Sequence, residues 1–193
     1  MIKIYIILGY NGDEMGFYTL FSKTGYEEKL LKEMELLWSF DEAMRLIMPR
    51  YDAKFRKGGK IFTEQRRLMP GYVFIESMLS GMDFYVLSRP LILWSEYALK
   101  LLRYGNSSLD TNFEMKSDES DVFQQLFGDK GCVDMSKGFI EGDLIIVTEG
   151  PLVGFEGMIK KINRHKMIAY LEIKIFGQLT RTEVGLEIIS KKT

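Results

Sequence analysis

The spacing of hydrophobic residues changes along the chain, from a mixed strand and helix pattern to one of short strands only. Residues 17–22 form an aromatic-rich apolar run of strand length. Apolar residues then recur at helical spacing from about 25 to 38, with charged residues on the other side. Thr24 and Glu27 have the spacing of a capping box at the start of this segment. The first predicted elements are therefore a buried strand and an amphipathic helix.

The following residues predict a hairpin and the rest of a small sheet. Two possible arms, residues 46–57 and 60–62, flank Gly58-Gly59, a pair able to adopt the positive φ of a tight turn. The other expected elements are a buried strand at 73–75, a short helix at 82–88 stopped by Arg89-Pro90, and a strand at 101–104. This order indicates an α+β sandwich over residues 15–105.

Residues 106–137 differ in composition from the segments on either side. They hold seven acidic residues and three lysines, and Val122 to Phe127 suggest one short helix. The remainder, from Gly128 to Lys137, is typical of a linker. An acidic helix and linker are therefore expected between two folded domains.

From residue 138 to 193 the pattern is that of strands alone. Four runs rich in β-branched residues are separated by Gly, Pro, Asn or charged turns, at 143–148, 155–162, 169–175 and 186–189. Several short strands without a helix predict a small β-barrel, which leaves no exposed sheet edge.

The glycine spacing within this region carries the most information. Gly150-Pro151 predicts a tight turn after the first strand, and Gly157 predicts a sharp bend in the second. The segment from Glu141 to Asn163, EGDLIIVTEGPLVGFEGMIKKIN, resembles the KOW motif of ribosomal proteins and transcription elongation factors. An unrelated sheet with glycine turns is the alternative.

Three further signatures, in the right order along the chain, resemble the NusG family. They are Phe17-Tyr18 with Lys23-Thr24-Gly25-Tyr26-Glu27, then Leu68-Met69-Pro70-Gly71-Tyr72-Val73-Phe74-Ile75, and last Ile175-Phe176-Gly177-Gln178-Leu179-Thr180 with Glu183. The resemblance implies an α+β protein, an NGN-type α/β sandwich followed by an SH3-like KOW β-barrel. Residues 1–14 would then be an N-terminal extension, either a strand or the product of a start assigned upstream of Met15.

The resemblance also implies partners and contact residues. The N-terminal domain would bind the clamp of RNA polymerase, and the matching positions are Phe21, Leu68, Met69 and Tyr72. Burial in the hydrophobic core is the alternative role for each of them. The KOW domain would recruit nascent RNA, such as a hairpin, or a ribosomal protein of the small subunit.

Four positions depart from the usual family pattern. Phe17 replaces a tryptophan, Met69 a phenylalanine, Gln178 an arginine and Arg181 a proline. These departures favour a specialised paralogue, of the LoaP or RfaH type, that serves selected long operons. The alternatives are a general NusG that couples polymerase to ribosome and Rho, and a translation-machinery protein that shares only the KOW barrel.

Two basic clusters stand out in a chain whose formal net charge is −1. The first lies in the hairpin region, where Arg56, Lys57, Lys60, Arg66 and Arg67 are candidates for contact with non-template DNA. A solvated hairpin is the alternative. The second consists of Lys160, Lys161, Arg164, His165 and Lys166, and is a candidate RNA-binding site. Protein-binding KOW domains also carry such lysines.

Enzymatic chemistry is not expected. One histidine and one cysteine, His165 and Cys132, make neither a metal site nor a nucleophile–base pair. The chain has no P-loop, no dinucleotide fingerprint and no H-E-x-x-H motif. We therefore expect a monomeric, non-enzymatic binding factor of the bacterial cytoplasm, without a cofactor or a membrane span.

Overall fold

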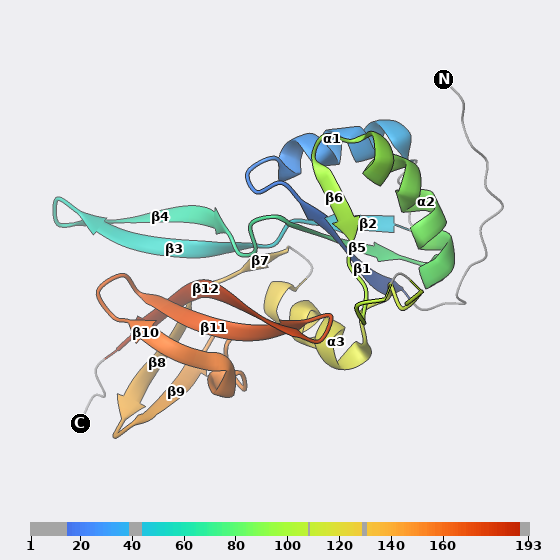
Figure 1. Ribbon diagram of the computed structural model, residues 1–193. Helices are drawn as coiled ribbons and strands as arrows, with labels where there is room; N and C mark the ends of the chain where they lie inside the picture. Colours follow the sequence, from blue (N-terminus) through green and yellow to red (C-terminus); the bar gives the residue numbers. More distant parts are fainter. Residues whose placement is uncertain (1–14, 39–43, 108, 129–130, 190–193) are drawn as a thin grey trace. The chain divides into compact units, whose positions relative to one another are not determined.

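The computed structural model describes residues 15–38, 44–107, 109–128 and 131–189, which fold as two compact units (Figure 1). The predicted N-terminal extension, residues 1–14, lies outside the described residues. Within the described chain, the first unit comprises residues 15–38, 44–47, 70–107 and 109–116, and the second 48–69, 117–128 and 131–189. The chain therefore passes between the units three times, and neither unit is one continuous segment.

The first unit is an antiparallel sheet covered by two helices. Its strands are β1 (Gly16–Ser22), β2 (Met44–Ile47), β5 (Tyr72–Ser77) and β6 (Ala98–Leu101), in the order β2-β5-β1-β6. The helices are α1 (Glu27–Leu37) and α2 (Gly81–Trp94). The ring of Tyr18 on β1 stacks on Phe84 of α2 with centroids 4.2 Å apart, and both side chains are fully buried. The core of this unit thus lies between the sheet and the helices.

The start of α1 differs from the predicted capping box. Tyr26 occupies the cap position, and no side chain caps the helix. Glu27 accepts hydrogen bonds at Oε1 from the backbone N–H groups of Gly25 and Gly71, at 3.1 and 2.5 Å. The carboxylate therefore ties the beginning of α1 to the turn that precedes β5.

Helix α2 does not stop at Arg89-Pro90 as expected but continues to Trp94. Ser80 caps its first turn, where its hydroxyl accepts from the N–H of Asp83 at 3.2 Å. Phe84 and Leu91 are both buried and anchor the helix on either side of Pro90. This packing outweighs the hydrogen bond that a proline in a helix forgoes.

The second unit contains the C-terminal barrel. Its strands are β8 (Ser136–Glu141), β9 (Leu144–Glu149), β10 (Ile159–Asn163), β11 (Ile168–Ile175) and β12 (Gln178–Ile188), in the order β10-β11-β12-β8-β9. β12 pairs antiparallel with β11 and parallel with β8. Helix α3 (Ser117–Phe127) belongs to the same unit and is held to it by Glu119, which accepts from the N–H of Gly177 at 3.0 Å. Apart from one 3-10 turn at Glu156–Met158, the elements of the described chain after residue 138 are strands, as predicted.

The glycines of the KOW segment have different roles. Gly150 has φ +94°, and a Cβ there would lie 2.7 Å from the Cα of Ser136, so this turn requires glycine. Gly157 does not bend a strand as predicted. It lies in a short 3-10 turn, Glu156–Met158, and β10 starts only at Ile159.

The second unit also contains the hairpin, which sequence analysis placed in the N-terminal domain. Its strands β3 (Arg50–Lys57) and β4 (Lys60–Arg67) pair around Gly58-Gly59, and β3 also pairs with β7 (Cys132–Val133). The two ends of the hairpin meet, because the N–H of Leu68 donates to the carbonyl of Pro49 at 2.8 Å. The domain boundaries that the sequence predicts at residues 105 and 138 stay predictions.

The base of the hairpin packs against β12 of the barrel. Tyr51 is buried, and its hydroxyl donates to Glu183 at 2.5 Å. Burial, reinforced by this carboxylate, raises the pKa of Tyr51 well above its usual value. A Cβ on Gly185 would lie 2.5 Å from the carbonyl oxygen of Asp52, so the two strands approach where no side chain fits. The apolar face of the hairpin base explains why it groups with the barrel.

Candidate functional site

A row of side chains crosses the sheet of the first unit at one level. Phe21 on β1 stands opposite Tyr72 on β5 and opposite Lys100 on β6. The rings of Phe21 and Tyr72 meet edge to face with centroids 5.2 Å apart, and Lys100 Nζ lies 5.9 Å from the Phe21 ring. Both aromatic rings are half-buried. We call Tyr72, Phe21 and Lys100 the aromatic row.

The turn before β5 fixes the aromatic row. Gly71 has φ +88°, and a Cβ there would lie 3.3 Å from the Phe21 ring. Its N–H donates to Glu27, and its carbonyl accepts from the N–H of Ser22 at 2.7 Å. The turn is therefore held on both sides, and it sets the position of Tyr72.

Leu68 and Met69 do not lie with Phe21 and Tyr72 in one unit. Both belong to the second unit and are only 2% and 4% exposed. The carbonyl of Leu68 accepts a hydrogen bond from the hydroxyl of Thr182 on β12. Of the four residues predicted to contact polymerase, only Phe21 and Tyr72 are thus part of a partly exposed surface.

The second predicted cluster forms one compact surface on the barrel. Lys160 and Lys161 lie on β10, and Arg164, His165 and Lys166 form the turn into β11; all five are exposed. We call these five residues the basic turn. Among the described residues, no carboxylate forms an ion pair with any of them, so their charges face solvent.

The backbone of the basic turn is well defined. The N–H of Lys166 donates to Asn163 Oδ1 at 3.0 Å, and the N–H of Met167 donates to the carbonyl of Arg164 at 3.3 Å. Met167 takes a positive φ of 52° and passes the chain into β11. Its carbonyl then accepts from the N–H of Leu186 on β12 at 2.9 Å. The turn is therefore fastened to the centre of the barrel sheet.

The predicted DNA-contacting residues of the hairpin differ in their surroundings. Lys60 is exposed, whereas Arg66 lies 3.0 Å from Glu64 in an ion pair and Arg67 is half-buried. The side chains of Arg56 and Lys57 lie outside the described part. The hairpin also offers an exposed pair that sequence analysis missed, Phe55 and Phe62. Their equal distance from Gly58-Gly59 was the available signal, since a two-residue turn places such positions opposite each other.

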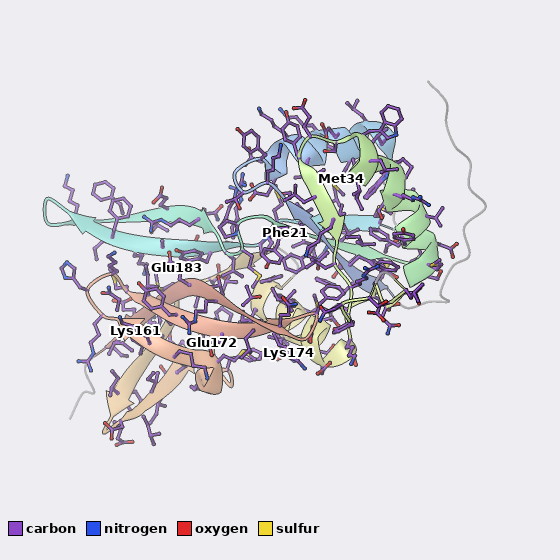
Figure 2. All side chains as sticks on the ribbon, in the orientation of Figure 1. Phe21, Met34, Lys161, Glu172, Lys174 and Glu183 are labelled. Carbon is purple, nitrogen blue, oxygen red and sulfur yellow. The ribbon has the colours of Figure 1, made fainter. Side chains whose placement is uncertain are left out.

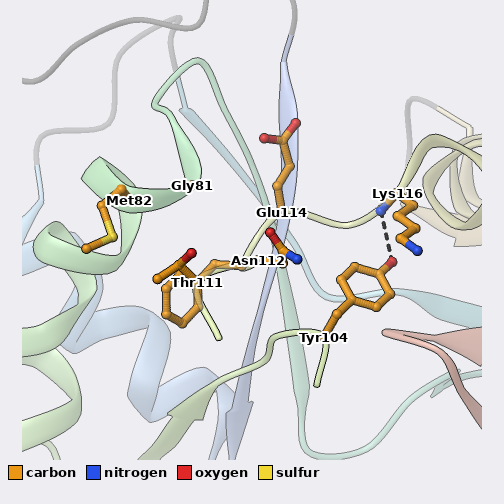
Figure 3. Close-up of a pocket in the computed structure, with 8 residues that line it drawn as sticks. Gly81, Met82, Tyr104, Thr111, Asn112, Glu114 and Lys116 are labelled. Atoms are coloured by element: carbon orange, nitrogen blue, oxygen red, sulfur yellow. Dashed lines mark hydrogen bonds between the residues drawn. The ribbon is translucent and has the colours of Figure 1, made fainter. Parts of the chain in front are cut away.

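Catalytic chemistry finds no support in the described residues. They hold no group of three His, Cys, Asp or Glu side chains placed to bind a metal. An open pocket of about 370 Å³ in the first unit is lined by Tyr104, Glu114 and Lys116 among others, without a histidine or cysteine (Figure 3). None of the described helices is long and apolar enough to cross a bilayer.

Comparison with known proteins finds matches that cover residues of both units. A family model for the KOW motif matches residues 141–174. The transcription termination/antitermination protein NusG of Pseudomonas aeruginosa is 22% identical, over 91% of this chain and 97% of its own. NusG of Bacillus subtilis is 23% identical, over 92% and 99% respectively. A solved structure, "Domain interaction in Thermotoga maritima NusG", matches with a TM-score of 0.51 and 25% identity, over 91% of this chain and 94% of that one.

These matches span both parts of the fold. They define the class as a two-part protein, in which an NGN-type unit of sheet and helices is joined to a KOW barrel. Over 91–92% of its length the chain is similar to NusG proteins. The relatives are transcription factors, in agreement with the expectation of a non-enzymatic protein.

Proposed function

We propose that the chain is a transcription elongation and antitermination factor that binds RNA polymerase through its N-terminal unit and nascent RNA through the barrel. It promotes read-through of selected operons by binding alone, because stabilising the elongating state of polymerase needs no chemistry. The observation that carries the RNA part of this proposal is the basic turn, with five exposed basic side chains on a KOW barrel.

The aromatic row supports the polymerase contact. Phe21 and Tyr72 match the family positions that face the clamp, and both retain partial exposure. Their edge-to-face packing presents a small, rigid apolar surface, which suits binding to another protein.

The chemistry of the basic turn supports contact with RNA phosphates. A folded RNA hairpin brings phosphates close together, and clustered Lys and Arg bind them with strong dependence on salt. Exposed cations without carboxylate partners need no rearrangement to bind. A ribosomal protein of the small subunit is the competing partner of this surface.

General NusG function is a second candidate. The observation in its favour is that the matched relatives carry the name NusG and are covered nearly from end to end. Against it stand Phe17, Met69, Gln178 and Arg181, where this chain departs from the usual family residues.

The first test is single-round transcription in vitro with bacterial RNA polymerase on a terminator-containing template. The wild-type chain is expected to raise read-through. Tyr72→Ala should reduce retention on polymerase about tenfold, because truncation of a central aromatic contact commonly costs 1–2 kcal/mol or more. Tyr26→Ala, which removes an exposed aromatic stacked on Tyr97, is the matched control and should bind normally.

A second pair of variants separates the RNA contact from the polymerase contact. Arg164→Gln with Lys166→Gln should keep polymerase retention but lose the dependence of read-through on leader RNA. Lys137→Gln, which alters a lysine paired with Glu149 on the barrel, should have no such effect. Read-through that is unchanged in the double variant would assign the barrel to a protein partner instead.

A further inference from the structure

Two aromatic rings are stacked and exposed near the tip of the hairpin. Phe55 on β3 stands directly opposite Phe62 on β4, and their ring centroids are 5.6 Å apart at an interplanar angle of 19°. Phe55 is 38% exposed and Phe62 43%. A cross-strand pair of this kind stabilises a hairpin, but its outer ring faces also remain accessible to a planar ligand.

The aromatic pair continues the face of the hairpin that packs on the barrel. Tyr51, Ala53 and Phe55 alternate along β3 and therefore share one face. Tyr51 and Ala53 are buried, and Tyr51 donates to Glu183, which lies between β12 and the hairpin (Figure 2). The barrel therefore covers this face of the hairpin as far as Ala53 but not Phe55. The aromatic pair extends past the edge of the barrel.

The basic turn is fastened to the same short stretch of β12 as the hairpin. Lys54 on β3 lies 3.8 Å from Glu187, while Met167, at the end of the basic turn, accepts from the N–H of Leu186. Both the hairpin tip and the β10–β11 turn point to the same side of the unit (Figure 1). Residues 183–187 of β12 thus contact both the hairpin and the basic turn. The aromatic surface of the hairpin and the cationic surface of the turn are therefore neighbours.

We propose that Phe55 and Phe62 form a base-stacking platform, and that this platform and the basic turn bind one single strand of nucleic acid between them. The cations of the turn contact the phosphates, and an unpaired base stacks on an outer ring face of the pair. This inference rests on the proposed RNA contact. It adds a second element, the hairpin, and a class of ligand, single-stranded nucleic acid.

The chemistry favours a single strand over a duplex or a protein. Bases within a duplex are already stacked and present only their edges, so exposed phenylalanine faces gain little from them. Unpaired bases stack on aromatic side chains beside cationic grooves in many single-strand binders. An acidic protein segment would satisfy the cations but would leave the stacked ring faces without a planar ligand.

The test measures fluorescence anisotropy of labelled oligomers titrated with the full-length chain. Oligo(U), oligo(dT) and a duplex of the same length, about 12 nucleotides, suit the site sizes of small barrels. Phe62→Ile should weaken binding of single strands at least about fivefold, the lower end of the effect of losing one stacked base, and should leave duplex binding unchanged. Comparison of oligo(U) with oligo(dT) identifies RNA or DNA as the preferred source of the strand.

Three variants make the result specific. Phe62→Tyr keeps an aromatic ring and should bind as the wild type does. Ile61→Ala changes the next, exposed residue, whose side chain lies on the other face of β4, and should also bind normally. Arg164→Gln should weaken both single strands and reduce the slope of log affinity against log salt by about one. Phe62→Ile keeps a β-branched residue in the strand, so the fold is preserved, which circular dichroism checks.

The outcomes distinguish this inference from the function that it extends. Equal binding by Phe62→Ile and wild type, with Arg164→Gln impaired, would overturn the platform and leave the proposed RNA contact intact. Two oligomers bound per chain would overturn the shared strand, since one site predicts one equivalent. Binding of a polyglutamate peptide, without binding of any single strand, would overturn both in favour of an acidic protein partner.

Discussion

Glu27 shows how one carboxylate links two parts of the first unit. The side chain is 1% exposed, and its Oε1 accepts from Gly25 at the start of α1 and from Gly71 in the turn before β5. Burying a carboxylate is costly unless it is hydrogen-bonded, so these two bonds are essential to its position. The position of Tyr72 therefore depends on Glu27 through the turn at Gly71.

We expect Glu27→Ala to lower the free energy of unfolding by about 2–4 kcal/mol, because two backbone N–H groups lose a charged acceptor. Glu27→Gln retains a carbonyl acceptor of the same shape and should cost less than half as much. Urea unfolding followed by circular dichroism measures both variants. Equal stability of the alanine and glutamine variants would contradict this role.

The hairpin is an element whose position depends on contacts with residues distant in sequence. Its base is held to β12 by Tyr51 with Glu183, by Lys54 with Glu187, and by the hydroxyl of Thr182 on the carbonyl of Leu68. The ion pair, which is half-buried and 3.8 Å long, contributes less than the buried tyrosine and threonine contacts. The packing buries Leu68 and Met69 and positions Phe55 and Phe62.

Tyr51→Phe should loosen the hairpin base by about 1–2 kcal/mol, because Glu183 loses its phenolic donor while the ring packing remains. Hydrogen exchange of the β3 and β12 amides should become faster, while the amides of β1 and β5 keep their protection. Tyr18→Phe is the matched control, since its hydroxyl donates to Leu79 within the first unit. Faster exchange at β1 in Tyr51→Phe would show global destabilisation instead.

Much of the element order follows from the sequence, because apolar periodicity and turn glycines act locally. The strand at 17–22, helix α1, the turn at Gly58-Gly59 and the barrel strands β9 and β11 were predicted. Strand β8 was not predicted and begins in the expected linker, and β12 begins well before the expected residue 186. The extent of α2 was not predicted, because burial of Phe84 and Leu91 overrides the local effect of Pro90.

The site was predictable where it lies within one local segment. The basic turn lies within residues 160–166, and the structure keeps its five residues together and exposed. The polymerase set was drawn from two segments, and the packing that buries Leu68 and Met69 in the second unit depends on long-range contacts. Lys100 was missed because only the pairing of β1 with β6 brings it to Phe21.

On the scale of the molecule, the similarity to NusG proteins and the departures from their usual pattern make different predictions. The matches to NusG proteins extend over 91% of the chain. Phe17, Met69, Gln178 and Arg181 distinguish it from the usual family pattern. A factor specialised for a few operons should be dispensable for growth, whereas a general factor should not.

Deletion of the gene is expected to reduce the distal transcripts of a few long operons, with growth in rich medium unaffected. RNA sequencing of the deletion strain, read as the ratio of distal to proximal coverage in each operon, measures this. Complementation with Tyr72→Ala should fail, while Tyr26→Ala should restore the distal transcripts. A broad growth defect with general loss of coverage would favour the general role.

The meeting of the two hairpin ends, where Leu68 donates to Pro49, makes residues 48–69 an insertion with a closed base. The cost of closing a longer loop grows slowly, by about 0.6 kcal/mol for each doubling of length. Extra residues at Gly58-Gly59 would therefore lengthen the arm with little effect on either core. The reach of the arm can thus be changed without disturbing the two cores, and its tip is a suitable place to attach a fluorescent reporter.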